Sequence, residues 1–262
     1  MSEHSAKPVA SLYLCHYSDW DFAALKQRFY WLLNTEEQER YERFKNLDAQ
    51  HQFLLGKILT RWFLAKHLDR QPESLLFQQN DHGKPSLVDN AIDFNLSHTQ
   101  GVVALAITNN GAIGLDVETT QRKSSTLEIA DHFFHPSEVT AISAGNTPND
   151  QRQRFFRFWT LKEAYVKAVG QGLQKSLQSF YFALGPQQQV AIADEECDLV
   201  GSQVQIYSYR VWSDYLLCWL QLAPLVANGG PQLWQVAPDL TISALEQAPD
   251  FFANSVALAA HG

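Results

Sequence analysis

The sequence predicts an α+β protein made of two similar units that meet near residue 112. Strand and helix patterns occur in blocks, because each half runs from a strand through several helices to further strands. The turn signal Asn-Asn-Gly at 109–111 separates the two blocks. The chain has 262 residues, of which 45% are hydrophobic, so it is long and apolar enough to bury a large core.

The first unit, residues 1–111, is expected to be rich in helix. Thr35 and Gln38 have the spacing of a capping box, which predicts that a helix begins there. The turn residues at 81–85 follow the second expected strand. The expected elements are a strand at 11–17, helices at 21–33, 36–44 and 48–68, and strands at 75–79, 92–98 and 102–108.

The second unit, residues 112–225, repeats this order. Pro136 stands where the first residue of a helix is expected, and 146–150 is expected to be a loop. The expected elements are a strand at 112–119, helices at 126–134, 136–142 and 151–169, and strands at 178–184, 189–193, 204–212 and 215–223. Residues 226–262 form a C-terminal extension whose role the pattern does not predict.

The helix expected at 151–169 has candidate functional side chains on the face opposite its buried face. The apolar stripe of its second half faces a core, whereas Glu163, Lys167 and Trp159 point away from that stripe. A face that only meets water does not need a tryptophan, so something is expected to pack there. The stripe consists of Leu161, Ala164, Tyr165, Ala168 and Val169.

Composition excludes several classes of protein. A net charge of −8 disfavours a nucleic-acid partner. The N-terminus lacks the apolar segment of a signal peptide, and no later stretch has the length of a membrane span, so we expect a cytoplasmic protein with no membrane partner. Cys15, Cys197 and Cys218 are too few and too scattered for a disulfide framework and are expected to be buried.

The charge is unevenly distributed along the chain. Residues 151–175 contain six lysines and arginines against one acid, Glu163, within an otherwise acidic protein. Such a basic segment is suited to a small polyanion or to an acidic protein surface. A solvated helix face is the alternative interpretation.

Two strand carboxylates are the first candidate for a metal site. Asp116 and Glu118 are two positions apart on an expected strand, so their side chains share one face. Neighbouring carboxylates raise each other's pKa unless a cation lies between them, and hard oxygen ligands suit Mg²⁺ better than Zn²⁺. The alternative for Asp116 and Glu118 is a strand end that faces solvent. The alternative for Glu163 and Lys167 is an ordinary ion pair on the surface of a helix. The combination is more specific, because Glu163 follows Asp116 by 47 residues within a basic environment.

Five stretches of the sequence, which occur in the same order as in a known family, resemble the motifs of that family. "IGLDVE" and "FWTLKEAYVKAVGQGL" resemble the signature of the 4′-phosphopantetheinyl transferases, and the chain length is similar to that of the larger, Sfp-type branch. The resemblance extends to "GKP" at 83–85, "FNLSHT" at 94–99 and "EIADHFFHPSE" at 128–138, and it covers about residues 30 to 185.

The resemblance implies a fold, a reaction and partners. The two α/β subdomains would be related by a pseudo-twofold axis in a monomer, with the active site in the cleft between them. The reaction would move phosphopantetheine from coenzyme A to a serine of an apo acyl, peptidyl or polyketide carrier protein, releasing 3′,5′-ADP. Asp116, Glu118 and Glu163 would bind Mg²⁺, with Mn²⁺ as the alternative ion. A noncatalytic carrier-binding scaffold and another Mg²⁺-dependent phosphotransferase are the rival hypotheses.

The resemblance also implies individual roles. Glu163 and Lys167 would act in catalysis, and Glu138 would be the general base. One contact is in doubt, because Gln52 stands where the family commonly has an arginine; His51, Lys57 or Arg61 would compensate. The alternative interpretation of His98 is a histidine with only a structural role. The residues implied to bind coenzyme A are Arg40, Arg43, Lys84, Pro85, Ser97, His98, Asp116 and Lys167.

Overall fold

The computed structural model describes residues 10–122, 126–186, 189–194, 204–222 and 230–254. It confirms the α+β class. Up to residue 111 the elements are β1 (Ser11–His16), α1 (Phe22–Phe29), the short 3₁₀ helix η1 (Tyr30–Leu32), α2 (Thr35–Glu42), α3 (Leu47–Leu68), η2 (Pro72–Ser74), β2 (Phe77–Gln79), β3 (Pro85–Leu87), β4 (Asp93–Thr99) and β5 (Val102–Thr108).

The remaining elements follow the same succession and then continue beyond it. They are β6 (Ala112–Thr119), α4 (Thr126–Phe133), α5 (Pro136–Ser143), α6 (Pro148–Val169), η3 (Gly172–Gln174), β7 (Phe180–Leu184), β8 (Val190–Asp194), β9 (Val204–Val211), β10 (Tyr215–Leu222), β11 (Gln232–Val236), β12 (Ile242–Ala244) and β13 (Phe251–Asn254).

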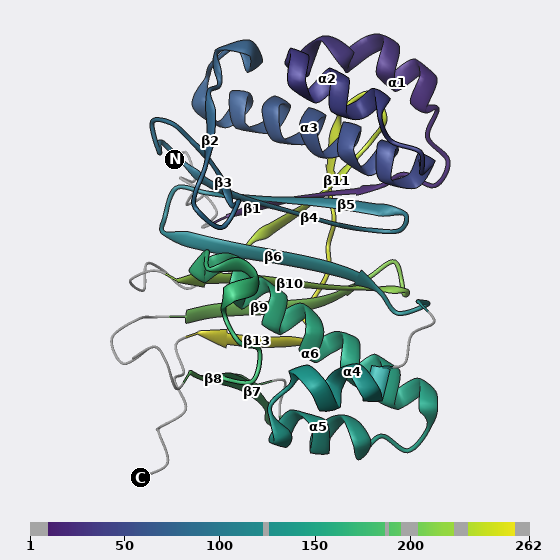
Figure 1. Ribbon diagram of the computed structural model, residues 1–262, viewed down its shortest axis with the longest axis vertical. Coiled ribbons are helices and arrows are strands. Elements are labelled where there is room, and N and C mark those ends of the chain that lie inside the picture. Colours follow the sequence, from purple (N-terminus) through teal and green to yellow (C-terminus); the bar gives the residue numbers. More distant parts are fainter. Residues whose placement is uncertain (1–9, 123–125, 187–188, 195–203, 223–229, 255–262) are drawn as a thin grey trace, which may run out of the picture.

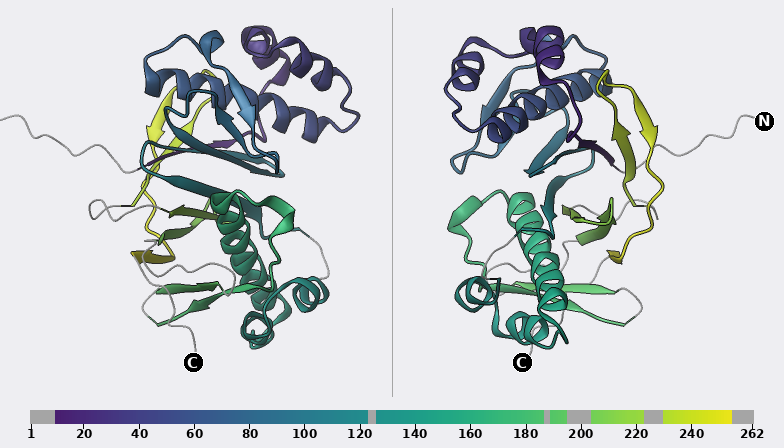
Figure 2. Two further views of the ribbon diagram at one scale, coloured as in Figure 1. Left: turned by 60° about the vertical axis from the view of Figure 1, so that its left-hand side comes forward. Right: turned by 90° about the vertical axis from the view of Figure 1, so that its right-hand side faces the viewer.

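The described elements form four layers (Figure 1). A five-stranded sheet, in the order β12-β11-β1-β5-β4, packs against a four-stranded sheet, in the order β13-β9-β10-β6. Alternate strand residues separate the cores, because on β5 Val103 and Leu105 face α3 whereas Ala104 and Ala106 face the second sheet. The helices α4–α6 cover the other face of the second sheet, as Figure 2 also shows. No helix among the described residues is long and apolar enough to cross a membrane.

Side chains of β4 join the two halves across β6. The backbone N–H groups of Ile113, Leu115 and Val117 donate to Asp93 Oδ2, Asn95 Oδ1 and Ser97 Oγ, respectively, over 3.0, 2.9 and 3.2 Å. Three side chains from one face of β4 thus occupy the hydrogen-bonding edge of β6 that a neighbouring strand would otherwise fill. We call this set of three bonds the β4–β6 seam.

Several sequence expectations need correction at the ends of elements. The capping box of α2 is formed by Asn34 and Glu37, one residue before the expected pair Thr35 and Gln38. Helix α6 begins at Pro148, inside the segment expected to be a loop, because the Thr147 hydroxyl accepts a hydrogen bond from Asp150 N. Strand β3 and the three strands after residue 230 were not expected.

The C-terminal extension is part of both sheets. Strand β11 pairs in parallel with β1, and β13 pairs antiparallel with β9. Leu233 and Val236 on β11 are buried. The extension therefore contributes side chains to the core of the first half and to the core between the two sheets.

Candidate active site

Strand β6 and helix α6 meet more closely than side chains normally permit. A Cβ atom on Gly114 would lie 1.8 Å from the backbone oxygen of Ala164 and 2.7 Å from Ala168 N. Only glycine allows this approach. It brings Glu163 and Lys167 of α6 over the face of β6 that carries Asp116, so the packing at Gly114 positions the candidate site.

Asp116 is the centre of this arrangement. Its carboxylate is buried, and Oδ1 accepts hydrogen bonds from Lys167 Nζ at 2.7 Å and from Ser97 Oγ at 2.9 Å. Lys167 Nζ also donates to Leu115 O at 3.0 Å. The second oxygen, Oδ2, is buried and has no hydrogen-bond partner within the part of the chain that the structure describes. An orphaned carboxylate oxygen is a free ligand for a cation.

The neighbouring glutamates are held in an unfavourable environment for charge. Desolvation, and then the charge of Asp116, raise the pKa of Glu118 to about 7, although a hydrogen bond from the Thr99 hydroxyl opposes this change. The same two causes raise the pKa of Glu163, with Lys167 opposing them. Both glutamates therefore sense Asp116, and one added cation would relieve all three carboxylates.

The three carboxylates fit a hard divalent ion in chemistry, although they do not form a complete metal centre. Oxygen donors, a partly open position and one unpaired carboxylate oxygen suit Mg²⁺. Within the described ranges no three histidine, cysteine, aspartate or glutamate side chains are already gathered as metal ligands. Lys167 and Ser97 occupy Oδ1 of Asp116, which leaves Oδ2 as the oxygen available to an ion.

A cavity of about 660 Å³ lies in the first half of the chain, on the face of β4 that carries Phe94, Leu96 and His98. Ser97, which bonds to Asp116, lies on the opposite face of this strand. His98 links the cavity to the carboxylates, because the charges of Lys167 and Asp116 both act on its pKa. Arg40, Lys57 and Arg61 bring positive charge to its wall. The cavity thus combines basic groups with apolar walls, as expected for a ligand bearing phosphates and a ring.

The basic groups of this cavity are partly paired. Lys57 Nζ and an Arg61 guanidinium nitrogen lie 2.9 and 3.0 Å from the two carboxylate oxygens of Glu37. Arg40 stacks over the Phe53 ring at 5.1 Å. Three cations, Arg40, Lys57 and Arg61, against the two lining acids, Glu36 and Glu37, leave one positive charge for an anionic ligand.

Other residues implied by the resemblance are distributed differently around the site. Pro85 lines the cavity, but Lys84 Nζ instead donates to Ile113 O at 3.1 Å and lies 3.7 Å from Asp93 Oδ2, beside the β4–β6 seam. Arg43 is exposed, and its Nε donates to Glu39 O. The His98 side chain is exposed at the cavity, and desolvation together with Lys167 lowers its pKa.

Gln52 takes part in a local network in place of an arginine. Its Nε2 lies 3.0 Å from Tyr17 Oη, 3.0 Å from Asp48 Oδ2 and 3.1 Å from Thr99 O. His51 stacks on a phenylalanine and does not line the cavity, whereas Lys57 and Arg61 do. Whether either of them replaces the phosphate contact of the arginine stays a prediction.

Glu138 is far from being an accessible base. It is completely buried, and its carboxylate accepts hydrogen bonds from Phe182 N and His135 N and pairs with Lys162 Nζ at 2.8 Å. Lys162 is also buried and donates to two backbone oxygens. A serine on a carrier protein cannot reach a carboxylate in this position, so the structure corrects the expectation that Glu138 is the general base.

The basic segment 151–175 is not a free basic surface. Most of its cations pair with acids from elsewhere in the chain, so its positive charge is largely neutralised internally. Lys162 and Lys175 are buried in such pairs. Trp159 packs on Phe134 and Phe155, which accounts for its place beside Glu163. The pairs are Arg154–Asp150, Arg157–Asp250, Lys162–Glu138, Lys167–Asp116 and Lys175–Asp194.

Thr99 is a site residue that the sequence analysis missed. Its hydroxyl donates to Glu118 Oε2 at 3.0 Å, just as the hydroxyl of Ser97 donates to Asp116. The signal was present in the spacing. Ser97 and Thr99 are two residues apart on β4, as Asp116 and Glu118 are on β6, so two hydroxyls face two carboxylates.

Comparisons with known proteins agree with this site. A family model described as the 4′-phosphopantetheinyl transferase superfamily matches residues 112–218, and one for the N-terminal part of a 4′-phosphopantetheinyl transferase matches residues 18–110. The two models meet between β5 and β6. Together they match both halves of the chain.

Individual relatives support the same assignment. The chain is 32% identical to the 4′-phosphopantetheinyl transferase gsp of Aneurinibacillus migulanus over 196 residues, which are 75% of this chain and 79% of that relative. It is 32% identical to the 4′-phosphopantetheinyl transferase Sfp of Bacillus subtilis over 63% of this chain and 73% of Sfp. The chain therefore belongs to the 4′-phosphopantetheinyl transferase superfamily, in the Sfp-type branch, and is a transferase.

Solved structures were also matched. The holo-[acyl-carrier-protein] synthase of Thermotoga maritima superposes with a TM-score of 0.35 and 19% identity, covering 44% of this chain and 65% of that one.

Proposed function

We propose that the protein transfers the 4′-phosphopantetheine group of coenzyme A to a serine hydroxyl of an apo acyl, peptidyl or polyketide carrier protein, in a Mg²⁺-dependent reaction that releases 3′,5′-ADP. The observation that carries the proposal is the buried Asp116 carboxylate, whose Oδ2 has no hydrogen-bond partner among the described residues and whose charge raises the pKa of Glu118 and of Glu163. A basic cavity lined by His98 supplies a place for an anionic substrate. The family to which the chain belongs supports the same reaction.

The chain's own residues would bind and orient coenzyme A. Arg40, Lys57 and Arg61 offer positive charge to its phosphates, and His98 and Pro85 line the same cavity. Ser97 and Lys167 would contact the diphosphate from the side of Asp116. We assign Lys84 and Arg43 to supporting positions, because neither lines the cavity. Such positioning supplies most of the catalysis in phosphoryl transfer.

In the transfer itself, the serine oxygen forms a bond to the phosphorus that carries the pantetheine. The bond from this phosphorus to the oxygen of 3′,5′-ADP breaks. Glu163 would receive the serine proton, as the acid of α6 that lies over the face of β6 carrying Asp116. Lys167 would neutralise charge on the diphosphate. Mg²⁺ bound by Asp116, Glu118 and Glu163 would supply further positive charge at the leaving group.

The arrangement of the halves belongs to the same proposal. Three helices cover the outer face of each packed sheet, which supports a pseudo-twofold relation between 1–111 and 112–225 with the active site at their junction. We further propose that the enzyme acts as a monomer in the cytoplasm.

Intact-mass measurement of a carrier protein tests the proposal directly. With coenzyme A and Mg²⁺, an apo carrier should gain one phosphopantetheine, and Glu163→Gln should reduce the rate by about 100-fold or more without unfolding the protein. The matched control is Glu128→Gln on the exposed face of α4, which should leave the rate unchanged. Unmodified carriers from fatty acid, polyketide and peptide synthesis would contradict the proposal. Tight binding of the carrier without turnover would favour the rival hypothesis of a noncatalytic scaffold. Release of phosphate from ATP would favour the rival hypothesis of another Mg²⁺-dependent phosphotransferase.

A further inference from the structure

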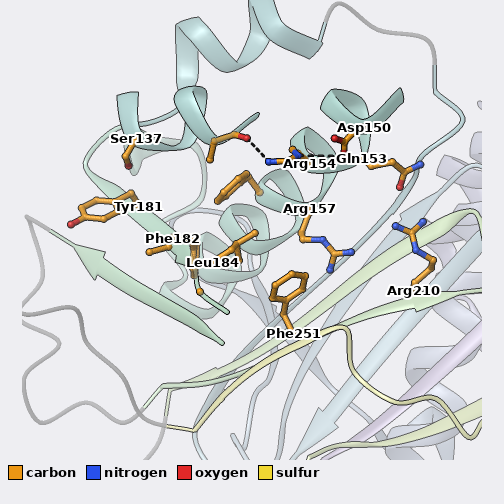
Figure 3. A pocket seen from close by; sticks show the side chains of 14 residues that line it. Ser137, Asp150, Gln153, Arg154, Arg157, Tyr181, Phe182, Leu184, Arg210 and Phe251 are labelled. Carbon is orange, nitrogen blue, oxygen red and sulfur yellow. Dashed lines mark hydrogen bonds and ion pairs between the residues drawn. The ribbon is translucent and has the colours of Figure 1, made fainter. Parts of the chain in front are cut away.

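A second cavity lies in the C-terminal half and shares no lining residue with the first. It has a volume of about 630 Å³ and lies between α5, α6, β7, β9 and β13 (Figure 3). Cavities of roughly 300 to 1,000 Å³ are typical of small-molecule sites. Nothing in the proposed transfer reaction uses this cavity.

Three arginines from two elements line it. Arg154 and Arg157 belong to α6, and Arg210 belongs to β9. In Figure 3 the Arg157 guanidinium lies beside the ring of Phe251, and Arg210 lies beyond Arg157 on the side away from that ring. The Arg157 guanidinium is 4.5 Å from that ring, a contact that holds it in place.

The acids near these arginines do not balance them. Asp250 Oδ2 lies 2.7 Å from an Arg157 nitrogen and 4.0 Å from Arg210 Nε, so two cations share one carboxylate. Arg154 pairs with Asp150 at 3.3 Å. Burial lowers the pKa of Arg157, and the charge of Arg210 acts in the same direction. Three cations against two acids leave one positive charge, which suits a monoanion better than a dianion.

The other walls indicate what accompanies that negative charge. Phe158, Phe182, Leu184 and Phe251 provide apolar surface. Gln153 also lines the cavity, and its buried Oε1 has no hydrogen-bond partner among the described residues. A buried acceptor without a partner destabilises the protein, so a ligand that donates a hydrogen bond to it is favoured.

We propose that this cavity binds a small monocarboxylic acid with an apolar body and one hydrogen-bond donor. The carboxylate pairs with Arg210 and Arg157, the apolar body lies against the phenylalanines, and the donor reaches Gln153. Carboxylate suits this site because a planar guanidinium can bind both of its oxygens at once. The site is a binding site separate from the proposed transfer centre.

Calorimetric titration of the full-length protein with N-acetylphenylalanine tests the assignment. This probe has one carboxylate, an aromatic body and one amide N–H. We expect saturable binding with a Kd below about 1 mM, and at least a tenfold weaker Kd for the neutral N-acetylphenylalaninamide. 3-Phenylpropionate, which lacks the donor, should bind about three- to tenfold more weakly.

Variants distinguish this cavity from the first. Arg210→Gln should weaken binding of N-acetylphenylalanine at least tenfold. It should retain transfer activity, because Arg210 does not line the first cavity. Arg154→Gln should act in the same direction if Arg210→Gln fails to fold. Two matched controls should leave the Kd unchanged. Arg152→Gln changes an arginine of α6 that does not line this cavity, and Arg40→Gln changes an arginine of the first cavity.

The proposal would be overturned by any of three results. One is the absence of saturable binding up to ~10 mM of the acid. Another is an equal loss of binding in Arg40→Gln, which would locate the acid in the first cavity. The third is tighter binding of phenyl phosphate, a dianion, than of N-acetylphenylalanine. None of these results depends on whether the transfer reaction itself is found.

Discussion

At the scale of single residues, the candidate site depends on matched spacing between two strands. The hydroxyls of Ser97 and Thr99 meet the carboxylates of Asp116 and Glu118 one to one. The sequence could predict that each pair shares a strand face, because that follows from the geometry of a strand. It could not predict that the two faces meet, since this depends on how the sheets pack.

Replacing Thr99 by valine should weaken the response to Mg²⁺. The change removes the hydrogen bond that opposes the raised pKa of Glu118, so the carboxylate becomes harder to ionise and a poorer ligand. We expect about a tenfold rise in the Mg²⁺ concentration that gives half-maximal transfer. Thr99→Ser is the control, because it retains the hydroxyl. Equal Mg²⁺ dependence in the valine and serine variants would contradict the role of Thr99.

The raised pKa of Glu118 also predicts how stability depends on pH when no divalent ion is present. Between the usual glutamate pKa of about 4.3 and the folded value of about 7, the folded state keeps a proton that the unfolded state has lost. The free energy of unfolding should therefore fall as pH rises through this window, by on the order of 2 kcal/mol. Glu163 acts in the same direction.

Differential scanning calorimetry in EDTA from pH 5 to pH 8 measures this effect. Glu118→Gln cannot ionise, so its unfolding temperature should fall less across the range than that of the wild-type protein. Parallel curves for the two proteins would show that Glu118 titrates normally in the folded state.

At the scale of elements, the long helices could be predicted well and the short strands could not. Helix α3 has enough apolar positions to define its buried face, and α6 has a clear stripe over its second half. Strands β3 and β12 have three residues each, too few to establish an alternation. The start of α6 was missed because its cap, Thr147, precedes a proline that also suits a loop.

The contact between β6 and α6 should be intolerant of any side chain at residue 114. Gly114→Ala places a methyl group against the backbone of α6, so the helix must move away from β6. We expect a loss of about 3 kcal/mol in the free energy of unfolding, together with loss of transfer. Gly185→Ala is the control, because its new Cβ meets neighbouring atoms only at 3.5 Å or beyond. Chemical denaturation compares the two variants, and equal stability would contradict this account.

The pair of Glu138 and Lys162 should matter for folding and not for chemistry. Glu138→Gln leaves the Lys162 ammonium buried without its counter-charge, which should cost about 3 to 5 kcal/mol. In conditions where the variant is folded, its transfer rate should stay within about threefold of wild type. A stable variant with greatly reduced transfer would instead restore Glu138 as a catalytic residue.

At the scale of the whole molecule, distant segments complete one another in ways that local patterns do not reveal. The excess charge of 151–175 is a correct count, but the acids that balance it lie as far away as Asp250. The strands after residue 230 pair with strands of both sheets, and the local sequence does not predict which strands these are. Pairing at long range is determined by packing, which a single sequence does not display.

The C-terminal extension should therefore contribute to global stability. Leu233→Ala removes a side chain from the core between the two sheets and should cost about 2 to 4 kcal/mol. Ile242→Ala is the control, because Ile242 is exposed, and it should cost less than about 0.5 kcal/mol. Denaturation midpoints measure both changes. If Leu233→Ala proved neutral, the extension would not belong to the core.

The β4–β6 seam differs from the strand ladders in what accepts its hydrogen bonds. Because side chains accept these three hydrogen bonds, rotation of a few side-chain bonds breaks them, with every strand ladder and the core between the sheets left intact. The amide protons of Ile113, Leu115 and Val117 should then exchange with deuterium together, as a single cooperative unit, faster than the amides inside either sheet. Their common rate would report how often the seam breaks.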